Sequence, residues 1–392
     1  MKYFFPFLLL FSSHLSAALP CCTIPEDPFP WNEQILSLDV YVHRQTIHIL
    51  TSRYDEASAQ NIIEYQNSKD SGKSWSKSTR VDEGKQVPHA RGRGTDFHLA
   101  VTDEAITAVW LTKGTGFGER GPLVAARSTD EGKTWSTIPT PADDRTNDDH
   151  AFIDVTATPN GAFHTVWLDT RSGDGKGLYL ATSNDHGETW ESNVSIDSKT
   201  CECCWNTLKS DSTGVLYALY RDTEPRDMAL ARSVDNGKTW DRLSSVGAFD
   251  WQFIGCPHAG GGLAIEDASS EAILHALVWT GQDDHAGLHY LKANASDLDW
   301  SSPLQLGSDN AKAADIAIND SDQLLATWVE TDAKGSTLMY STSNNQGAFW
   351  SSPQVIDTPN SSPSHPRVLS IDDEFHLFWT SNYGLKHLQV SN

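Results

Sequence analysis

Short apolar runs recur along the chain at regular intervals, and each ends near an aromatic residue. In seven of these runs apolar residues alternate with other residues in closely similar patterns. Another short apolar run precedes each one across a polar turn, and a third apolar run follows it. Alternation over a few residues between turn signals is typical of β-strands. The seven runs are residues 47–50, 107–110, 164–167, 217–220, 276–279, 325–328 and 376–379.

An octet with the pattern Ser-x-Asp-x-Gly-x-Ser/Thr-Trp follows the third run of several units. Its aspartate can accept backbone N–H bonds and its glycine tolerates positive φ, so the octet predicts a folded turn. The tryptophan that ends it is a large apolar anchor suited to packing between sheets. The four clean copies are 68–75, 128–135, 183–190 and 233–240, and the two degraded copies are 293–300 and 343–350.

The octets lie roughly 50–60 residues apart, a period that indicates a repeat architecture. Each unit is expected to contain strand, turn, strand, loop, strand, octet and strand, which is one blade of a β-propeller. We therefore predict a single all-β domain over residues 19–392, with seven blades preferred and six as the alternative. The seventh unit ends after its third strand, so the segment 23–35 is expected to supply the closing strand and cover a free sheet edge.

The octet resembles the Asp box, or BNR repeat, of sialidases and several other β-propeller families. In those families the box is a structural turn away from the active face. The resemblance therefore implies a sialidase-like fold and a structural role for the box aspartates.

The net charge and the N-terminal sequence indicate which partners are unsuitable and where the protein is located. The formal net charge is −23, which repels phosphate backbones and makes nucleic acid an unsuitable partner. Residues 1–18 have a lysine, an apolar core and a small-residue cleavage site, so they predict a signal peptide and a soluble, periplasmic or secreted protein. No later stretch reaches the length of apolar sequence that a membrane-spanning helix needs.

Residues just before the first strand of each unit are expected to share one face of the propeller channel, where functional loops collect. Counting back from the second-strand aromatic places Cys, His and Arg there in successive units. Cysteine and histidine together are ligands for zinc or copper, and thiolate favours Cu(I). The candidate metal ligands are Cys201, Cys203, Cys204, Cys256, His258 and His150.

Two other roles for the cysteines remain open. An exported protein with six cysteines can form three disulfides, and a bond from 201–204 to Cys256 would join two adjacent blades. A redox-active thiol site is the third possibility.

Polar residues at these entry positions and in the loops between the second and third strands, which open on the same face, form a second candidate site. They could bind a small ligand, a glycan or a partner protein, whereas the simpler interpretation is a solvated rim with local salt bridges. The candidate ligand-binding residues are Arg93, Arg221, Asp222, Arg226 and His365.

The segment 220–222 followed by 229–240 resembles a sialidase blade. The resemblance implies three arginines on a substrate carboxylate, a tyrosine nucleophile with a glutamate, and an aspartate as acid–base. Residues 32–37 lack the Phe/Tyr-Arg-Ile-Pro motif that opens the first blade in that family. Arg93, Arg221 and Arg367 are the arginines available for a substitute triad, and no Tyr–Glu pair is assigned.

The preferred interpretation is therefore an exported binding protein with a Cys/His metal site. A sialidase-like exo-glycoside hydrolase acting on sialylated or related glycans is the first alternative. An interaction scaffold stapled by disulfides is the second.

Overall fold

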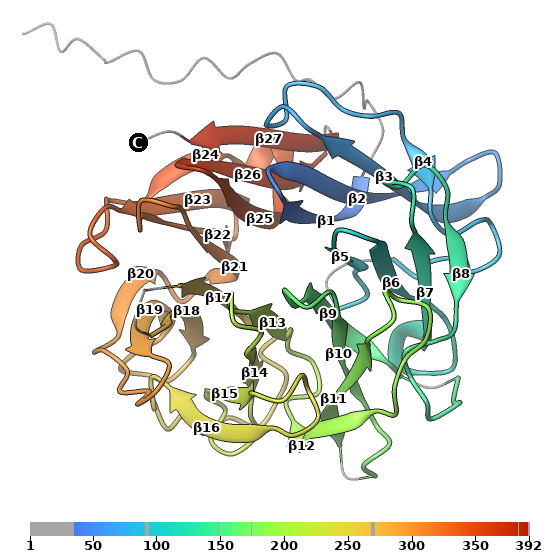
Figure 1. The fold of residues 1–392 in the computed structure, drawn as a ribbon. Coiled ribbons are helices and arrows are strands. Elements are labelled where there is room, and N and C mark those ends of the chain that lie inside the picture. Colours follow the sequence, from blue (N-terminus) through green and yellow to red (C-terminus); the bar gives the residue numbers. More distant parts are fainter. Residues whose placement is uncertain are drawn as a thin grey trace, which may run out of the picture.

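Seven antiparallel sheets are arranged around a central axis, as Figure 1 shows for the computed structural model. Six sheets have four strands and the last, β25-β26-β27, has three. This confirms the all-β propeller and the count of seven blades. The structure describes residues 35–90, 94–147, 149–173, 175–267, 271–382 and 384–390.

Each blade runs from an inner strand to an outer strand in chain order, as the repeat predicted. The strands of the first four blades are β1 Ile35–His43, β2 Thr46–Asp55, β3 Gln60–Ser68, β4 Thr79–Arg80, β5 His98–Val101, β6 Ile106–Lys113, β7 Arg120–Ser128, β8 Ser136–Ile138, β9 Ala151–Ala157, β10 Phe163–Asp169, β11 Lys176–Ser183, β12 Val194–Thr200, β13 Thr207–Ser210, β14 Leu216–Arg221, β15 Met228–Ser233 and β16 Asp241–Val246. Those of the last three are β17 Gly261–Glu266, β18 Ile273–Thr280, β19 Gly287–Asn294, β20 Leu304–Gly307, β21 Ala311–Ile318, β22 Leu324–Asp332, β23 Gly335–Ser343, β24 Gln354–Asp357, β25 Ser364–Ile371, β26 Glu374–Ser381 and β27 Gly384–Val390.

The second strand of each blade is deeply buried because both of its faces pack against neighbouring blades. β10 is buried along its whole length, and Trp110, Trp167 and Trp328 on three such strands are fully enclosed. The helical content is limited to two short 3₁₀ turns, Phe117–Glu119 and Pro359–Ser361, in the described residues. No helix in this described part of the chain is long and apolar enough to cross a membrane.

The predicted Asp-box turn forms in the same way in the four clean copies. In the second box the Asp130 carboxylate accepts the Thr134 N–H at 2.8 Å and the Thr134 hydroxyl at 2.7 Å. The Ser128 hydroxyl accepts the Gly132 N–H at 2.9 Å. The Thr134 N–H and hydroxyl bonds lower the pKa of Asp130 to about 2, because they favour the ionised form. The box aspartates are therefore structural acceptors.

The glycine of the box lets neighbouring blades approach closely. A Cβ at Gly132 would come within 2.0 Å of the Tyr65 ring in the preceding blade. A Cβ at Gly72 would come within 2.7 Å of His387, which lies in the last blade. Both glycines also have positive φ, 80° and 81°. The first box thus packs directly against the last blade, and β1 and β25 also lie in contact. The ring is closed at this point.

Aspartates on inner strands join one blade to the next. The Asp39 carboxylate accepts the Leu99 N–H at 3.0 Å, and Asp154 accepts the Leu208 N–H at 2.7 Å. In the same way, the Asp315 carboxylate on β21 accepts the Val368 N–H at 2.9 Å. These bonds satisfy backbone donors at the inner edge, where no further strand is available.

Two predictions fall outside the described residues. The signal peptide at 1–18 lies there entirely. The closing strand predicted at 23–35 lies there too, except for Ile35, which begins β1. Both stay predictions.

Candidate functional site

Two short segments bring the described cysteines to equivalent positions in adjacent blades. Cys201, Cys203 and Cys204 lie between the outer strand β12 and the next inner strand β13. Cys256 lies between β16 and β17, which is the same connection one blade later. The Cys201 N–H donates to the Arg221 carbonyl at 2.9 Å, which fixes the first segment to the end of β14.

Three of the sulfurs converge in the interior. The Sγ atoms of Cys201 and Cys204 are 2.7 Å apart, and those of Cys201 and Cys203 are 3.8 Å apart. All three sulfurs lie within 4.8 Å of one another. Cys201 and Cys204 are 1 % exposed and Cys203 is 7 % exposed. All four described cysteines are free thiols, and Cys21 and Cys22 lie outside the described residues.

Hydrogen bonding among the thiols stabilises one anionic sulfur. Bonds from Cys203 and then Cys204 lower the pKa of the Cys201 thiol. The pKa of Cys203 is raised by its hydrogen bond to Cys201, and the pKa of Cys204 is raised by burial. Thiolate is the form of cysteine that binds metals, so the lowered pKa makes Cys201 the thiol of the cluster that most readily becomes a ligand.

A buried arginine supplies positive charge beside this cluster. Arg221 is 1 % exposed, and its guanidinium donates to the carbonyls of Ala259, Arg226 and Trp279 at 3.0, 2.5 and 2.6 Å. Among the described residues, no carboxylate lies within ion-pair distance of it. Its charge contributes to the lowered pKa of Cys201, and at Cys204 it opposes the larger effect of burial, which raises the pKa overall. Three backbone carbonyls therefore satisfy the guanidinium, and its charge also acts on the neighbouring cysteine cluster.

The two candidate histidine ligands occupy different surroundings. His258 is exposed and its Nδ1 lies 2.9 Å from the Cys256 carbonyl oxygen, so it is next to the second cysteine segment. His150 is grouped with Asp144 and Asp169 instead of the three-cysteine cluster, with its Nε2 3.2 Å from the Asp144 carboxylate. The structure therefore brings the three clustered cysteines together and separates His150 from them.

The remaining predicted ligand residues are dispersed. Asp222 is paired with Arg242, and burial raises its pKa. Arg226 is partly buried and donates to the Phe253 carbonyl at 2.9 Å. His365 is buried with its Nε2 3.3 Å from the Asp96 carboxylate. Arg93 lies outside the described residues.

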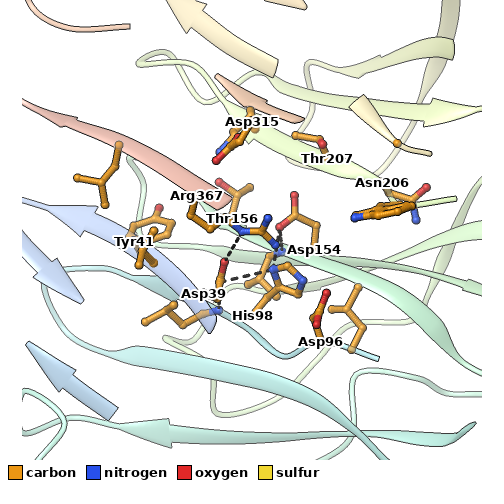
Figure 2. Close-up of a pocket in the computed structure, with 18 of the residues that line it drawn as sticks. Asp39, Tyr41, Asp96, His98, Asp154, Thr156, Asn206, Thr207, Asp315 and Arg367 are labelled. Atoms are coloured by element: carbon orange, nitrogen blue, oxygen red, sulfur yellow. Dashed lines mark hydrogen bonds and ion pairs between the residues drawn. The ribbon is translucent and has the colours of Figure 1, made fainter. Parts of the chain in front are cut away.

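A polar cavity of about 310 Å³ occupies the central channel (Figure 2). Its wall combines Asp39, Asp154, His98 and Arg367, from four different inner strands. His98 Nδ1 lies 3.5 Å from Asp39 and 3.4 Å from Asp154, and Arg367 Nε lies 3.4 Å from Asp39. Burial lowers the pKa of His98, but the carboxylates of Asp39 and Asp154 outweigh it and raise the pKa overall. The channel therefore holds an alternating network of opposite charges.

Of these four residues only Arg367 was predicted from the sequence as a substrate-binding residue, and Asp39, His98 and Asp154 were not. Register offers a signal that identifies several of them. In four blades, one residue of the inner strand projects a polar side chain into the channel. Its strand-pairing partner on the second strand is the residue directly before the tryptophan. These pairs are His98 with Val109, Asp154 with Val166, Asp315 with Thr327 and Arg367 with Phe378.

Trp205 links the cysteine cluster to the channel. It follows Cys204 directly, lines the channel cavity and contacts the Phe152 ring at a centroid distance of 6.5 Å. The cysteine cluster therefore lies beside the wall of the channel cavity.

Comparison with known proteins supports the architecture. The BNR repeat-like domain matches residues 62–251. A protein of unknown function from Dyadobacter fermentans DSM 18053 is 16 % identical with a TM-score of 0.50, over 76 % of this chain and 91 % of that one. The Hadza microbial sialidase Hz136 is 15 % identical with a TM-score of 0.50, over 91 % of this chain and 65 % of that one.

A Trypanosoma rangeli sialidase, solved with the inhibitor DANA, is 13 % identical with a TM-score of 0.50, over 80 % of this chain and 55 % of that one. This chain therefore spans less than two thirds of either sialidase. At these identities the likeness shows the fold alone. No curated protein matches the chain.

Proposed function

Because this chain is an Asp-box, or BNR-repeat, β-propeller that resembles the sialidase-like superfamily, we propose that it is an exported binding protein that holds a thiophilic metal ion beside its channel. The observation that carries the proposal is the convergence of the Cys201, Cys203 and Cys204 sulfurs within 4.8 Å in the interior. Apolar burial alone would leave such thiols inert. Here they adjoin the buried Arg221 cation, which suits an anionic metal–thiolate centre.

Copper(I) is the preferred ion and zinc is the second. Soft thiolate ligands select Cu(I) and Zn²⁺ over harder ions. Zinc in a closed structural site takes four ligands in a tetrahedron, so it would need Cys256 or His258 in addition to the three buried sulfurs. Three sulfurs without a nitrogen donor between them favour copper(I). The roles of His258 and Cys256 therefore decide between the two ions.

Metal analysis of the protein purified under reducing conditions tests this proposal. We expect about one equivalent of copper or zinc in the wild-type protein. The Cys203→Ser/Cys204→Ser double variant should lose the metal and keep its β-sheet circular dichroism spectrum. Val234→Ser is the control, because Val234 is exposed in the fourth Asp box. Disulfides among the four described cysteines, mapped by mass spectrometry in protein without metal, would instead favour the disulfide-stapled scaffold.

Sialidase-like glycoside hydrolysis is the second candidate. It is favoured by the polar channel cavity that contains the Arg367 guanidinium, because guanidinium suits a substrate carboxylate. The Asp39 and Asp154 carboxylates in the same cavity repel an anionic sugar. We therefore rank metal binding above sialidase activity. Release of fluorophore from a fluorogenic sialoside, lost on Arg367→Ala, would reverse this order.

A further inference from the structure

Two of the three clustered cysteines are placed as a pair that can close into a disulfide. Cys201 and Cys204 are the ends of a Cys-x-x-Cys segment, and their Sγ atoms are 2.7 Å apart although both are free thiols. A disulfide bond is about 2.05 Å long, so the two sulfurs need to approach by only about 0.7 Å. Cys203 Sγ lies farther from Cys201, at 3.8 Å. The geometry therefore favours Cys204 as the partner of Cys201.

The surroundings of the pair hold the two sulfurs in this position. Residues 201–206, all of which the structure describes, contain no strand, but both ends of this segment are tied to other parts of the chain. At one end the Cys201 N–H donates to the Arg221 carbonyl at 2.9 Å. At the other end the Asn206 side-chain amide donates to the Phe152 carbonyl at 2.9 Å. Both cysteines are buried in close packing, which limits rotation of one sulfur away from the other.

Closing this pair and binding a metal ion exclude each other. A thiophilic ion at this site takes deprotonated sulfurs as its ligands. A disulfide between Cys201 and Cys204 uses two of the three sulfurs that lie within 4.8 Å of one another. Of the cluster, Cys203 would then be the one sulfur left as a ligand. Because the ion binds the reduced form and not the disulfide, metal binding and oxidation are thermodynamically linked.

We propose that Cys201 and Cys204 form a reversible redox switch, and that the closed form does not hold the metal ion. The inference rests on the proposed metal-binding function. The oxidant is hydrogen peroxide, which an exported dithiol can meet outside the reducing cytosol. One thiolate attacks a peroxide oxygen and becomes a sulfenic acid, and the other thiol attacks that sulfur with loss of water. The two thiols together lose two electrons and two protons, and the peroxide becomes two molecules of water.

Thiol mapping of the full chain, reduced and freed of metal, tests closure of the pair. Trypsin is expected to cut after Lys199 and Lys209, so the peptide 200–209 contains all three clustered cysteines. After treatment with about one equivalent of hydrogen peroxide, we expect this peptide to lose two hydrogen atoms and to be alkylated at Cys203 alone. Dithiothreitol should restore alkylation at all three cysteines.

Metal uptake by the same samples tests the consequence of closure. Cu(I) is offered from a chromogenic chelator without added thiol, and zinc is offered in the same way. We expect the reduced protein to take up one of these ions and the oxidised protein to take up neither, because the disulfide has no thiolate to offer. Protein that has been reduced again with dithiothreitol, and then separated from it, should regain its uptake.

Two variants serve as controls, and circular dichroism establishes that both are folded. Cys203→Ser keeps the pair and should still close, whereas the peptide of Cys204→Ser should not lose two hydrogen atoms. The same loss in Cys204→Ser, full alkylation of the wild-type peptide after peroxide, or unchanged metal uptake after closure would overturn the switch and leave the metal site intact.

Two further outcomes are distinguishable from these. A Cys201–Cys204 disulfide that dithiothreitol does not open in the folded protein would be a permanent bond, and the switch would be wrong. Reduced wild-type protein that takes up neither Cu(I) nor zinc would overturn the proposed function and the switch together.

Discussion

Arg221 and Cys201 are joined by a backbone hydrogen bond of 2.9 Å, and the Arg221 charge adds to the hydrogen bonds from Cys203 and Cys204 that lower the pKa of the Cys201 thiol. One residue thus holds the cysteine segment in place and supplies the charge that favours a thiolate. This arrangement differs from the substrate-binding role predicted for Arg221, since its donors are directed at three backbone carbonyls.

Replacement of Arg221 should weaken metal binding. Arg221→Met removes the buried charge, and we expect Cu(I) affinity to fall by about 10- to 100-fold, as for groups that support a metal ligand. Arg221→Lys retains the charge and should lose less. Chelator competition measures the affinity, and circular dichroism establishes that each variant is folded. Equal Cu(I) affinities in Arg221→Met and the wild-type protein would show that the Arg221 charge does not support metal binding.

The second Asp box should stabilise the fold in a pH-dependent way. Asp130→Ala removes the acceptor of the Thr134 bonds, and we expect a loss of about 1 kcal/mol in the free energy of unfolding near neutral pH. The folded pKa of about 2 is below the ordinary value of 3.8. The ionic part of this stabilisation is therefore present above pH 4 and is lost as the pH falls from about 4 to 2.

Urea unfolding at several pH values measures this loss. Asp130→Asn is the matched variant, because the sixth box naturally has Asn345, whose Oδ1 accepts the Phe349 N–H at 2.9 Å. Asp130→Asn should therefore be milder than Asp130→Ala. A difference between wild type and Asp130→Ala that did not change with pH would contradict the ionic contribution.

Close packing between blades should depend on Gly132. Gly132→Ala places a Cβ within 2.0 Å of the Tyr65 ring, and overpacking of this kind costs about 1–3 kcal/mol beyond the backbone strain. Gly118→Ala is the matched control, since Gly118 also has positive φ, 67°, but a Cβ there meets nothing within 4 Å. Thermal unfolding compares the two. Equal destabilisation would mean that the contact with Tyr65 adjusts freely.

The channel network should keep His98 protonated above its ordinary range. The folded pKa of His98 is raised, so its contribution to stability is complete below the ordinary pKa of 6.5 and is lost as the pH rises through the folded pKa. Asp39→Asn removes one attracting carboxylate and should lower that pKa. Titration of the His98 ring protons by NMR measures it. An unchanged His98 pKa in Asp39→Asn would show that Asp39 does not set it.

Most of the fold could be predicted because its signals are local. Turn chemistry in the Asp box and alternation in the strands depend on neighbours within a few residues. These signals were sufficient to identify the order of strands within a blade and the number of blades. The regular spacing also predicted that Cys203 and Cys256 lie in equivalent connections of adjacent blades.

The site was decided only by tertiary structure. The interaction between Asp39 and Arg367 spans 328 residues and forms only because the last blade meets the first. Spacing placed His150 and Cys203 on one rim, but side-chain direction and packing put His150 with Asp144 and Asp169. The burial of Arg221 depends on carbonyls supplied by the following segments of the chain. The sequence by itself therefore determined the repeating blade, whereas closure of the ring decided which charges and thiols meet, because those contacts are between blades.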